Sequence, residues 1–537
     1  VQKFSWSGEQ GMVNPQRIDG GDWLFLPAAA DLTSLWLDLG ALEPDVSVSF
    51  QGDLGTADAM PLNLTALATP GAYGEYSLTV TLSREAETRS RTVRIMASGN
   101  LPAIFLTSEE GAGRAFVDAV KGNAVKGSMV MLDPDGTVRY DDTLSQIKSR
   151  GNSTFYYPKK PYQIKLNKKS DLLGNGEKVK TWVLLANYAD STLFRDKLCK
   201  DLAADMGLPG TPECRWVDLY FDGEYRGCYL LTEKVQIAST GLDITDLEGM
   251  YEDVNPDYGD DVTLAVAYNR FGDPLCYVEG LIDPENMENG YLLEMNHHHG
   301  DENSWFQTKR GWAFNVKSPE NLTQRAMTYI SEYYQEFEDA VYGLDYFGNY
   351  SGVNAETGKS YTEYCDLDSL ARMYLLYYFS NNQDAYVQST YFYMEDGILH
   401  AGPIWDSDQT FGIGWVENRA PDSELLWSYL VEALVQLPDF QDKVREIYDT
   451  SFRQLALDYA NGKVPEYGEL LSLSEAMNHR VWPVYYRVSG LGTAYPADIR
   501  YSEILAQTSQ WMTDRIAFMD RIFAAWKPEP ETPVTPE

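Results

Sequence analysis

Acidic residues gather near both ends of one short stretch, residues 381–412, whose sequence is NNQDAYVQSTYFYMEDGILHAGPIWDSDQTFG. Asp384 lies near its start, and Asp406 and Asp408 lie near its end. Carboxylates held close together repel each other and lose hydration, so a protein usually keeps several of them close in order to bind a divalent cation through oxygen ligands. A surface hairpin with solvated acids is the alternative, and these residues alone do not decide between the two.

The residues between the acids predict a β-hairpin. Residues 390–394 alternate aromatic and polar side chains as a strand does, Glu-Asp-Gly at 395–397 is a turn sequence, and residues 398–403 return as a second strand. A hairpin brings its two ends together. We therefore expect the acids on its two sides to share one small volume.

The polar residues around this hairpin have a spacing similar to that in protein kinases. Ser389 follows Asp384 by five residues, and the catalytic loop of a kinase carries an Asp followed five residues later by a metal-binding Asn. A kinase also has a metal-binding Asp after the hairpin, which is the place that Asp406 occupies in this chain.

Length and composition bound the class of protein. At 537 residues the chain is too long for one hydrophobic core, so two or more domains are expected. Acidic residues outnumber basic ones by 80 to 43, which gives a formal charge of −37. Such a surface repels nucleic acid and anionic lipid and attracts basic partners, which argues against DNA or RNA binding. The richness in Tyr and Trp together with the acidic balance favours a secreted protein.

The cysteines and the termini add three expectations. The five cysteines show no zinc-binding spacing, and we expect them to be buried thiols. No run reaches the ~18 apolar residues that a membrane-spanning helix needs. The chain begins at Val1 rather than Met, so we expect that a leader has been removed or trimmed.

Two domains and a tail are expected along the chain. Residues 1–98 contain short strands separated by Gly, Pro and Asp, which predicts a small β-sandwich of the immunoglobulin-like type that acts as a spacer or interaction module. The pattern then changes, and residues 99–526 form the second domain. Within it, residues 241–284 are acidic, irregular and dotted with Gly, as expected of an insertion or a lid. Residues 527–537, KPEPETPVTPE, are expected to be a disordered tail.

A small polar turn and a strand that follows it could bind phosphate. Arg150, Asn152 and Ser153 belong to the turn sequence RGNST, whose backbone N–H groups can face a phosphate. In the strand KPYQIKL, Lys165 lies between two apolar residues, so its side chain points to the face opposite theirs. An ordinary exposed strand face would show the same alternation.

Apolar residues at helical spacing predict the helices of the second domain. Asp190 and Ser191 are expected to cap the first of them. The predicted helices are 192–206, 322–341, 366–380, 423–437, 440–460, 467–488 and 502–526. Their apolar stripes are explained more simply by a helical core than by ligand sites.

Three adjacent histidines, His297, His298 and His299, follow a predicted strand at 290–295. Neighbouring residues of a strand point to opposite faces, so three in a row cannot all face one metal ion from a strand. We expect a polar loop there, with capture of a metal ion as the alternative.

Six sequence blocks occur in an order that resembles a known family. The blocks are SRGNST, KKPYQIKL, WVLLANYADSTLFRDKL, GEYRGCYLLTEKV, NNQDAY and IWDSDQTFG. Together they resemble the CotH family, which is named for a spore-coat protein and regarded as atypical protein kinases, over roughly residues 101–526. The resemblance implies an α+β, bilobal, kinase-like fold. It also implies that ATP and a divalent metal, Mg²⁺ or Mn²⁺, are used to phosphorylate Ser or Thr in exported or cell-surface proteins.

The resemblance also implies which residues bind the nucleotide. Lys165 would contact the phosphates of ATP, and the turn containing Arg150, Asn152 and Ser153 would lie near them. An acidic residue would pair with the lysine, and Glu233 is one possibility among several.

For catalysis and metal binding, the resemblance implies that Asp384 orients the substrate hydroxyl and accepts its proton. Asp406 would hold the metal, with Asp408 as a second candidate. The family usually has Asn at the position of Ser389, and a Ser is a poorer metal ligand.

The partner expected from charge is a basic or Ser/Thr-rich protein, with an extracellular or cell-surface location. The oligomeric state does not follow from the sequence. A surface adhesion or scaffold protein that has lost catalysis is an alternative function, favoured by Ser389 and by the leading β-sandwich. A carbohydrate-binding or carbohydrate-active protein is a third, because the chain is rich in Trp, Tyr and carboxylates.

Overall fold

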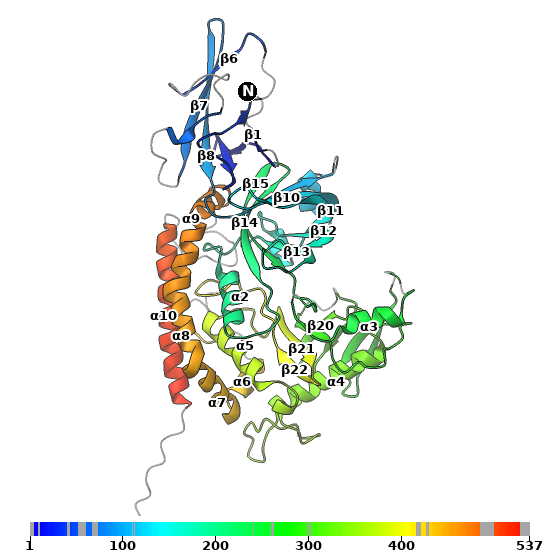
Figure 1. The fold of residues 1–537 in the computed structure, drawn as a ribbon. Coiled ribbons are helices and arrows are strands. Elements are labelled where there is room, and N and C mark those ends of the chain that lie inside the picture. Colours follow the sequence, from blue (N-terminus) through cyan, green and yellow to red (C-terminus); the bar gives the residue numbers. More distant parts are fainter. Residues whose placement is uncertain are drawn as a thin grey trace, which may run out of the picture.

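The computed structural model describes most of the 537-residue chain. The described residues are 5–8, 11–39, 43–51, 61–66, 74–109, 111, 113–239, 241–257, 259, 262–297, 300, 302–414, 420–425, 429–483 and 499–526. Their fold is mixed α+β, with several sheets that follow one another from the N-terminal strands down to a helical region (Figure 1). The tail predicted at 527–537 lies outside the described residues.

Two sheets form the N-terminal region, where the sequence predicts a β-sandwich. The strands are β1 (Ser5–Gly8), β2 (Gly11–Val13), β3 (Gln16–Ile18), β4 (Gly21–Leu26), β5 (Leu37–Asp38), β6 (Ser47–Phe50), β7 (Tyr76–Arg84) and β8 (Glu87–Ala97), with a 3-10 turn, η3 (Leu64–Ala66). The smaller sheet has the order β2-β1-β5 and the larger has the order β3-β4-β8-β7-β6. Phe25 of the larger sheet packs on Tyr225 of the barrel that follows, with 5.1 Å between the ring centres. An immunoglobulin-like topology stays a prediction.

A closed barrel follows the N-terminal sheets. Its strands are β9 (Ala103–Ser108), β10 (Ala124–Leu132), β11 (Val138–Ser149), β12 (Tyr162–Ser170), β13 (Val179–Leu185), β14 (Cys214–Phe221) and β15 (Glu224–Glu233). They close in the order β10-β11-β12-β13-β15-β14-β9, with β9 and β14 parallel. Two short helical elements, α1 (Gly113–Ala119) and η4 (Ser153–Tyr156), and the helix α2 (Arg195–Asp205) lie between these strands in the sequence. Ile147, Ile164 and Trp182 fill the interior, so alternate residues of their strands point outward.

A seven-stranded sheet lies below the barrel (Figure 1). Its strands are β16 (Leu264–Tyr268), β17 (Pro274–Val278), β18 (Tyr291–Met295), β19 (Trp305–Gln307), β20 (Ala313–Ser318), β21 (Thr390–Glu395) and β22 (Ile398–Ala401), in the order β16-β17-β19-β20-β18-β21-β22.

The expectation of an irregular segment at 241–284 is wrong. The segment contains the helix α3 (Leu247–Val254) and the strands β16 and β17, which pair with each other and extend the seven-stranded sheet. β17 pairs with β19, which lies further along the chain, and β16 joins the sheet only through β17, so local composition did not reveal these strands.

The C-terminal half is mostly helical. Its elements are α4 (Gln324–Val341), η6 (Tyr361–Glu363), α5 (Leu367–Ser380), α6 (Val431–Leu434), α7 (Pro438–Ile447), η8 (Tyr448–Phe452), α8 (Arg453–Asp458), η9 (Tyr459–Lys463), α9 (Val464–Val481) and α10 (Tyr501–Ala525). The π-helical turns η8 and η9 join α7, α8 and α9 into one run. In Figure 1, α8 and α9 follow each other end to end along one edge of the molecule, and α10 lies beside them. α9 also packs against β15 and β8.

Several helix predictions hold with shifted ends. The helices predicted at 322–341, 366–380 and 502–526 correspond to α4, α5 and α10. The helix predicted at 423–437 is wrong in extent, because only α6 is helical there among the described residues. Asp366 accepts a hydrogen bond from Ser369 N at 2.8 Å and so caps α5, as a short acidic side chain does at a helix start.

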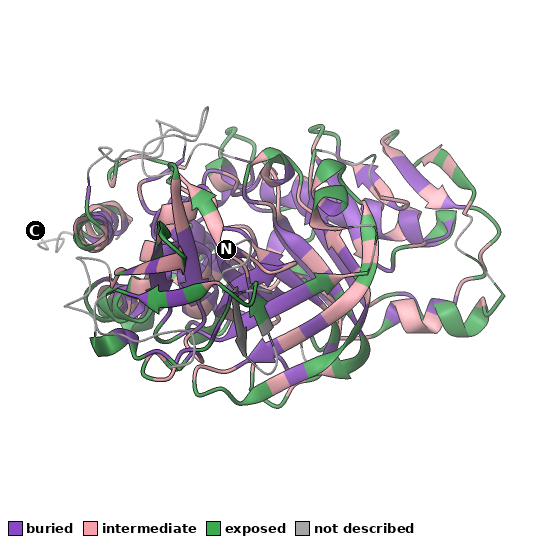
Figure 2. Ribbon diagram, turned by 90° about the horizontal axis from the view of Figure 1, so that it is seen from above, coloured by how far each residue is buried: buried purple, intermediate pink, exposed green. Residues whose placement is uncertain are grey.

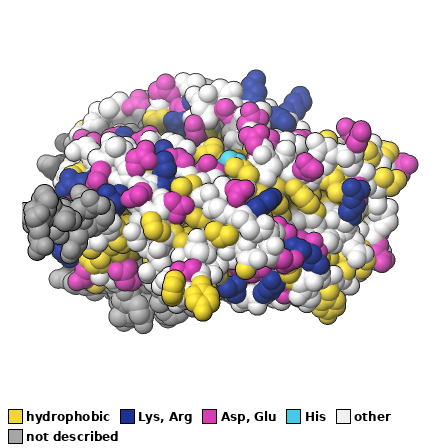
Figure 3. Space-filling model, turned by 90° about the horizontal axis from the view of Figure 1, so that it is seen from below, with side chains coloured by type: hydrophobic (Ala, Val, Ile, Leu, Met, Phe, Trp, Pro, Cys, Tyr) yellow, Lys and Arg dark blue, Asp and Glu magenta, His cyan; other side chains and the backbone are white. Residues whose placement is uncertain are grey.

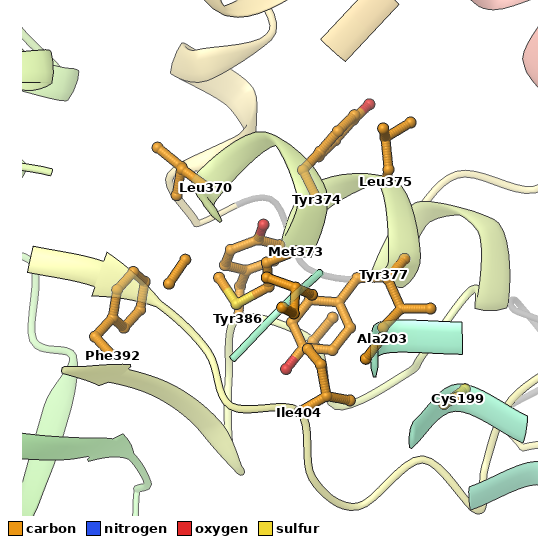
Figure 4. Packing of buried hydrophobic residues seen from close by; sticks show 14 of the residues in the cluster. Cys199, Ala203, Leu370, Met373, Tyr374, Leu375, Tyr377, Tyr386, Phe392 and Ile404 are labelled. Atoms are coloured by element: carbon orange, nitrogen blue, oxygen red, sulfur yellow. The ribbon is translucent and has the colours of Figure 1, made fainter. Parts of the chain in front are cut away.

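The core gathers around α5, which is buried on nearly every side. Figure 4 shows Met373 and Tyr377 of this helix packed with Phe392 of β21 and Ile404 beyond β22, with Cys199 of α2 close by. Figure 2 shows that buried residues are concentrated in the central strands and exposed residues in the outer loops. The helix thus fixes both the chain before the hairpin and the chain after it.

The state of the cysteines agrees with the expectation of buried thiols. Figure 3 shows acidic and basic side chains interspersed over the face seen from below. All five cysteines are free thiols; Cys214 is half-buried and the other four are buried. Across the described residues, none of the helices combines the length and the apolarity that crossing a membrane requires.

Candidate functional site

A cavity of about 820 Å³ opens between the barrel and the seven-stranded sheet. The barrel side contributes Lys148, Gln163 and the turn after β11, and the sheet side contributes residues of β18, β20 and β21. The acidic loop after β22 closes one end, since Trp405, Asp406 and Asp408 also line the cavity.

The predicted hairpin is confirmed. β21 and β22 pair antiparallel, and the turn between them has Asp396 and Gly397 at φ 52° and 74°, as a two-residue hairpin turn requires. Its two ends meet, because Ser389 Oγ donates a hydrogen bond to Asp406 Oδ2 at 3.3 Å. Asn382 Nδ2 also donates to the backbone oxygen of Asp406 at 3.4 Å.

The acids on the two sides of the hairpin repel one another. Burial and then the neighbouring Asp406 raise the pKa of Asp384 to about 7. Burial and Asp196 raise the pKa of Asp406, and burial and Asp406 raise that of Asp408. Among the described residues, no three His, Cys, Asp or Glu side chains already form a metal-binding group, so the metal ligands stay a prediction.

The backbone is strained where the hairpin ends meet. Ser389 has a φ of 50° and Asp406 a φ of 59°, in the left-handed region that residues with a side chain rarely adopt. Strain of this kind, about 1–3 kcal/mol per residue, collects where a site needs particular side-chain directions. Here it aims a hydroxyl and a carboxylate at each other.

Asp196 of α2 is a residue of the site that the sequence did not single out. It lines the cavity, and its Oδ1 accepts a hydrogen bond from the backbone N–H of Ser407 at 2.9 Å. Lys200 Nζ lies 3.5 Å from Asp196 Oδ2 and 4.0 Å from the centre of the Trp405 ring. The spacing of four residues between this Asp and Lys places them on one face of the helix, which was the available signal.

The predicted start of the helix at 192–206 is wrong. The helix begins at Arg195 rather than at 192, because Asp190 first accepts hydrogen bonds from Thr192 N at 2.9 Å and from Arg195 N at 2.8 Å. Asp190 Oδ1 also lies 2.5 Å from the guanidinium of Arg195, and both side chains are fully buried. This ion pair anchors the helix that carries Asp196.

The polar turn after β11 reaches the cavity. Arg150, Asn152 and Ser153 all line it, and Lys121 Nζ donates to Asn152 Oδ1 at 2.8 Å. Gly151 has a φ of 93°, and a Cβ there would lie 2.1 Å from Thr154 Oγ1, so the turn requires glycine.

Arg150 connects this turn to the acids. Burial lowers the pKa of Arg150, and among the charges that oppose this shift Asp406 has the largest effect. Its guanidinium carbon lies 5.9 Å from the centre of the Trp405 ring, on the loop that carries Asp406. Cation and acids therefore meet across the cavity.

Three of the predicted residues, Asp384, Lys165 and Glu233, are not among the described residues that line the cavity, whereas the other predicted residues do line it. Lys165 is exposed. Lys148 does line the cavity. Lys148 of β11 lies opposite Gln163 of β12, and the next pair whose side chains point to the same side is Gln146 and Lys165. Burial, and then Arg150, Lys234 and Lys165, lower the pKa of Lys148. The roles of Lys165 and Glu233 stay predictions.

Of two further predicted features, the described part of the histidine run reaches the cavity and that of the predicted lid segment does not. His297 lines it, while His298 and His299 lie outside the described residues. In the segment predicted as a lid, 241–284, no described residue lines the cavity. Tyr157, which was not singled out, does line it, and burial followed by Asp408 raises its pKa to about 12.

A family model matches most of this chain. The family model described as "CotH kinase protein" matches residues 147–519, which is more than half of the chain and includes both the polar turn after β11 and the hairpin of β21 and β22. No curated protein matches the chain significantly. The extent of the family match shows that this chain belongs to the CotH family.

Proposed function

We propose that this protein is a bilobal, kinase-like enzyme that transfers phosphate from ATP to Ser or Thr of exported proteins with the help of a divalent metal. The observation that carries the proposal is one cavity with cations on one side and acids on the other. Lys148 and Arg150 come from the barrel, and Asp406 and Asp408 come from the loop after the hairpin. Family membership supports the same reaction.

The donor set fits Mg²⁺ or Mn²⁺. The carboxylates of Asp406 and Asp408 and the hydroxyl of Ser389 are hard oxygen ligands of the kind these ions prefer. Burial and neighbouring acids raise the pKa of both groups, and a bound cation would oppose this effect. When bound, the ion neutralises negative charge on the phosphates.

The chain's own residues would divide the remaining work. Asp384 would orient the acceptor hydroxyl and accept its proton, and a pKa of about 7 suits that role near neutral pH. Lys148 and Arg150 would hold the phosphates, helped by the turn at 151–153. Lys165 would add positive potential from the next outward position on the same barrel face.

The substrate and location follow from charge and family. A formal charge of −37 attracts basic partners, so we propose a basic or Ser/Thr-rich protein substrate. A location outside the cell or on its surface, as for a spore-coat protein, is proposed from the family. In this proposal the N-terminal sheets are an immunoglobulin-like accessory module.

The test is transfer of labelled phosphate from ATP to a basic protein or to the enzyme itself, with Mg²⁺ or Mn²⁺. Asp384→Asn and Asp406→Ala are expected to lose the transfer, because one removes the base and the other a metal ligand. Asp396→Asn is the matched control, since Asp396 is an exposed residue at the tip of the same hairpin. Equal labelling by the two site variants and the wild type would refute the proposal.

A non-catalytic adhesion or scaffold protein is the second candidate. It is favoured by Ser389, whose hydroxyl is a poorer metal ligand than the Asn usual in the family and already donates to Asp406. Absence of nucleotide binding by the wild type, with metal present, would select this candidate.

A further inference from the structure

The seven-stranded sheet turns a polar face toward the cavity. β18 and β20 pair antiparallel, with Glu294 opposite Asn315. Alternate residues of the two strands point to opposite sides, and Leu293, Met295, Phe314 and Val316 enter the core beneath them. The cavity-facing residues of the same strands and of the turn after β18 are Glu294, Asn296, Asn315 and Lys317. This wall is distinct from the cationic turn and from the acidic loop.

Most charges on this wall are already matched. Lys317 forms an ion pair with Glu302 and lies 3.6 Å from Glu294 Oε2. Tyr391 of the neighbouring β21 is hydrogen-bonded to Glu294, and burial raises the pKa of that glutamate. The charged groups therefore stabilise one another without a ligand.

Asn315 is a polar residue of the same wall that has an unpaired side-chain atom. Its side chain is 1% exposed, yet no described residue donates a hydrogen bond to its Oδ1. A buried carbonyl oxygen without a donor is costly, so its presence beside a cavity calls for an explanation. Because Asn315 lines the cavity, the missing donor is expected to come from what the cavity binds.

We infer that Asn315 is a specificity-determining residue that accepts a hydrogen bond from the nucleoside part of the bound nucleotide. This inference rests on the proposed function. Phosphate oxygens are acceptors and cannot satisfy Asn315 Oδ1, and the nearby Glu294 and Glu302 repel them. The donors of ATP are the ribose hydroxyls and the exocyclic amine of adenine, and either fits a buried amide oxygen.

The experiment measures nucleotide binding by calorimetry with Mn²⁺ for the wild type and for Asn315→Leu, which keeps the volume but lacks the acceptor. The ligands are ATP, 2′-deoxy-ATP and 3′-deoxy-ATP, which each lack one ribose hydroxyl, and inosine triphosphate, which lacks the amine. The wild type is expected to prefer ATP over one of these analogues by about tenfold, the worth of one hydrogen bond from a buried site. In Asn315→Leu that preference disappears because ATP binds about tenfold more weakly while the analogue binds as before.

The pattern identifies the donor. Lost discrimination against a deoxy analogue assigns that ribose hydroxyl, and lost discrimination against inosine triphosphate assigns the amine. Asn315→Asp retains an acceptor and is expected to keep the preference. An unchanged or higher melting temperature of Asn315→Leu, expected because a buried unpaired oxygen is removed, shows that the variant is folded.

Two other results would overturn the inference, and they are distinguishable. If the wild type binds nucleotides and a folded Asn315→Leu binds all four as the wild type does, Asn315 makes no contact with the nucleoside although the proposed function survives. If the wild type binds none of the four, both the proposed function and this inference fail.

Discussion

Removal of Asp196 is expected to damage the site through a buried ion pair. Asp196 is 1% exposed and Lys200 is 2% exposed, so the substitution Asp196→Ala leaves a lysine ammonium in the interior without its counter-charge. Breaking a buried pair from one side costs about 3–5 kcal/mol. The hydrogen bond from Ser407 N is lost as well, which costs about 1 kcal/mol more. The expected loss of unfolding free energy is therefore about 4–6 kcal/mol.

A double-mutant cycle separates the ion pair from general damage. Lys200→Met leaves Asp196 with its hydrogen bond from Ser407 N, so its expected loss is smaller, about 2–4 kcal/mol. When both residues are replaced, neither member of this pair is left without the other, and the double variant is expected to lose less than Asp196→Ala alone. The coupling energy should exceed about 2 kcal/mol, well above the ~0.5 kcal/mol typical of independent sites.

The assay is urea denaturation of the four proteins followed by far-ultraviolet circular dichroism, together with titration by Mn²⁺. Because Asp196 holds the backbone of the loop that carries Asp406, Asp196→Ala should weaken Mn²⁺ binding by at least roughly tenfold, as loss of a supporting group usually does. Losses that add to within 0.5 kcal/mol, or unchanged Mn²⁺ affinity in a folded Asp196→Ala, would refute the reasoning.

Three further changes have defined outcomes. Gly151→Ala should lower the unfolding free energy by roughly 2 kcal/mol and weaken ATP binding, because φ is 93° at this residue and the new Cβ would lie 2.1 Å from Thr154 Oγ1. A melting curve and a nucleotide titration that match those of the wild type would contradict this prediction. Burial raises the pKa of Glu475 from 4.5 to about 8, so between these pH values the folded state binds more protons than the unfolded state and stability falls as pH rises. Glu475→Gln should remove that loss, so the variant should be more stable than the wild type by roughly 4 kcal/mol at most at pH 8, and the difference should vanish near pH 4.5. Urea denaturation at both pH values measures this difference in unfolding free energy. A difference that does not change with pH would contradict the prediction. Lys148→Met should weaken ATP binding roughly tenfold and Lys165→Met less than threefold, since only Lys148 lines the cavity and an exposed lysine is screened; calorimetry with the order reversed would contradict the placement.

The features that the sequence predicted well are those with local signals. The hairpin at β21 and β22 was recognisable because Glu395, Asp396 and Gly397 form a turn between alternating strands. The helix α5 was recognisable because residues 366–380 are rich in apolar side chains at helical spacing. The outward direction of Lys165 was also correct, since period-two alternation alone decides which face a side chain takes.

The features that were missed depend on distant contacts. The position of the seven-stranded sheet decides which outward-pointing residues of the barrel reach the cavity. The sequence alone therefore could not show that Lys148 lines the cavity and that the exposed Lys165 does not. Asp196 acts on Ser407, 211 residues later, and within its own helix it looks like an ordinary acidic residue. The strands β16 and β17 needed the edge of a sheet built by residues further along the chain.

The central claim is that the cations of the barrel and the acids after the hairpin hold one nucleotide through a bound metal ion. The most direct measurement is calorimetric titration of ATP into the wild type with Mn²⁺ and again with a chelator, repeated for Asp406→Ala and for the control Asp396→Asn. The account predicts binding that requires Mn²⁺, is lost in Asp406→Ala and persists in Asp396→Asn. Equal ATP binding with chelator, or in Asp406→Ala, would contradict it.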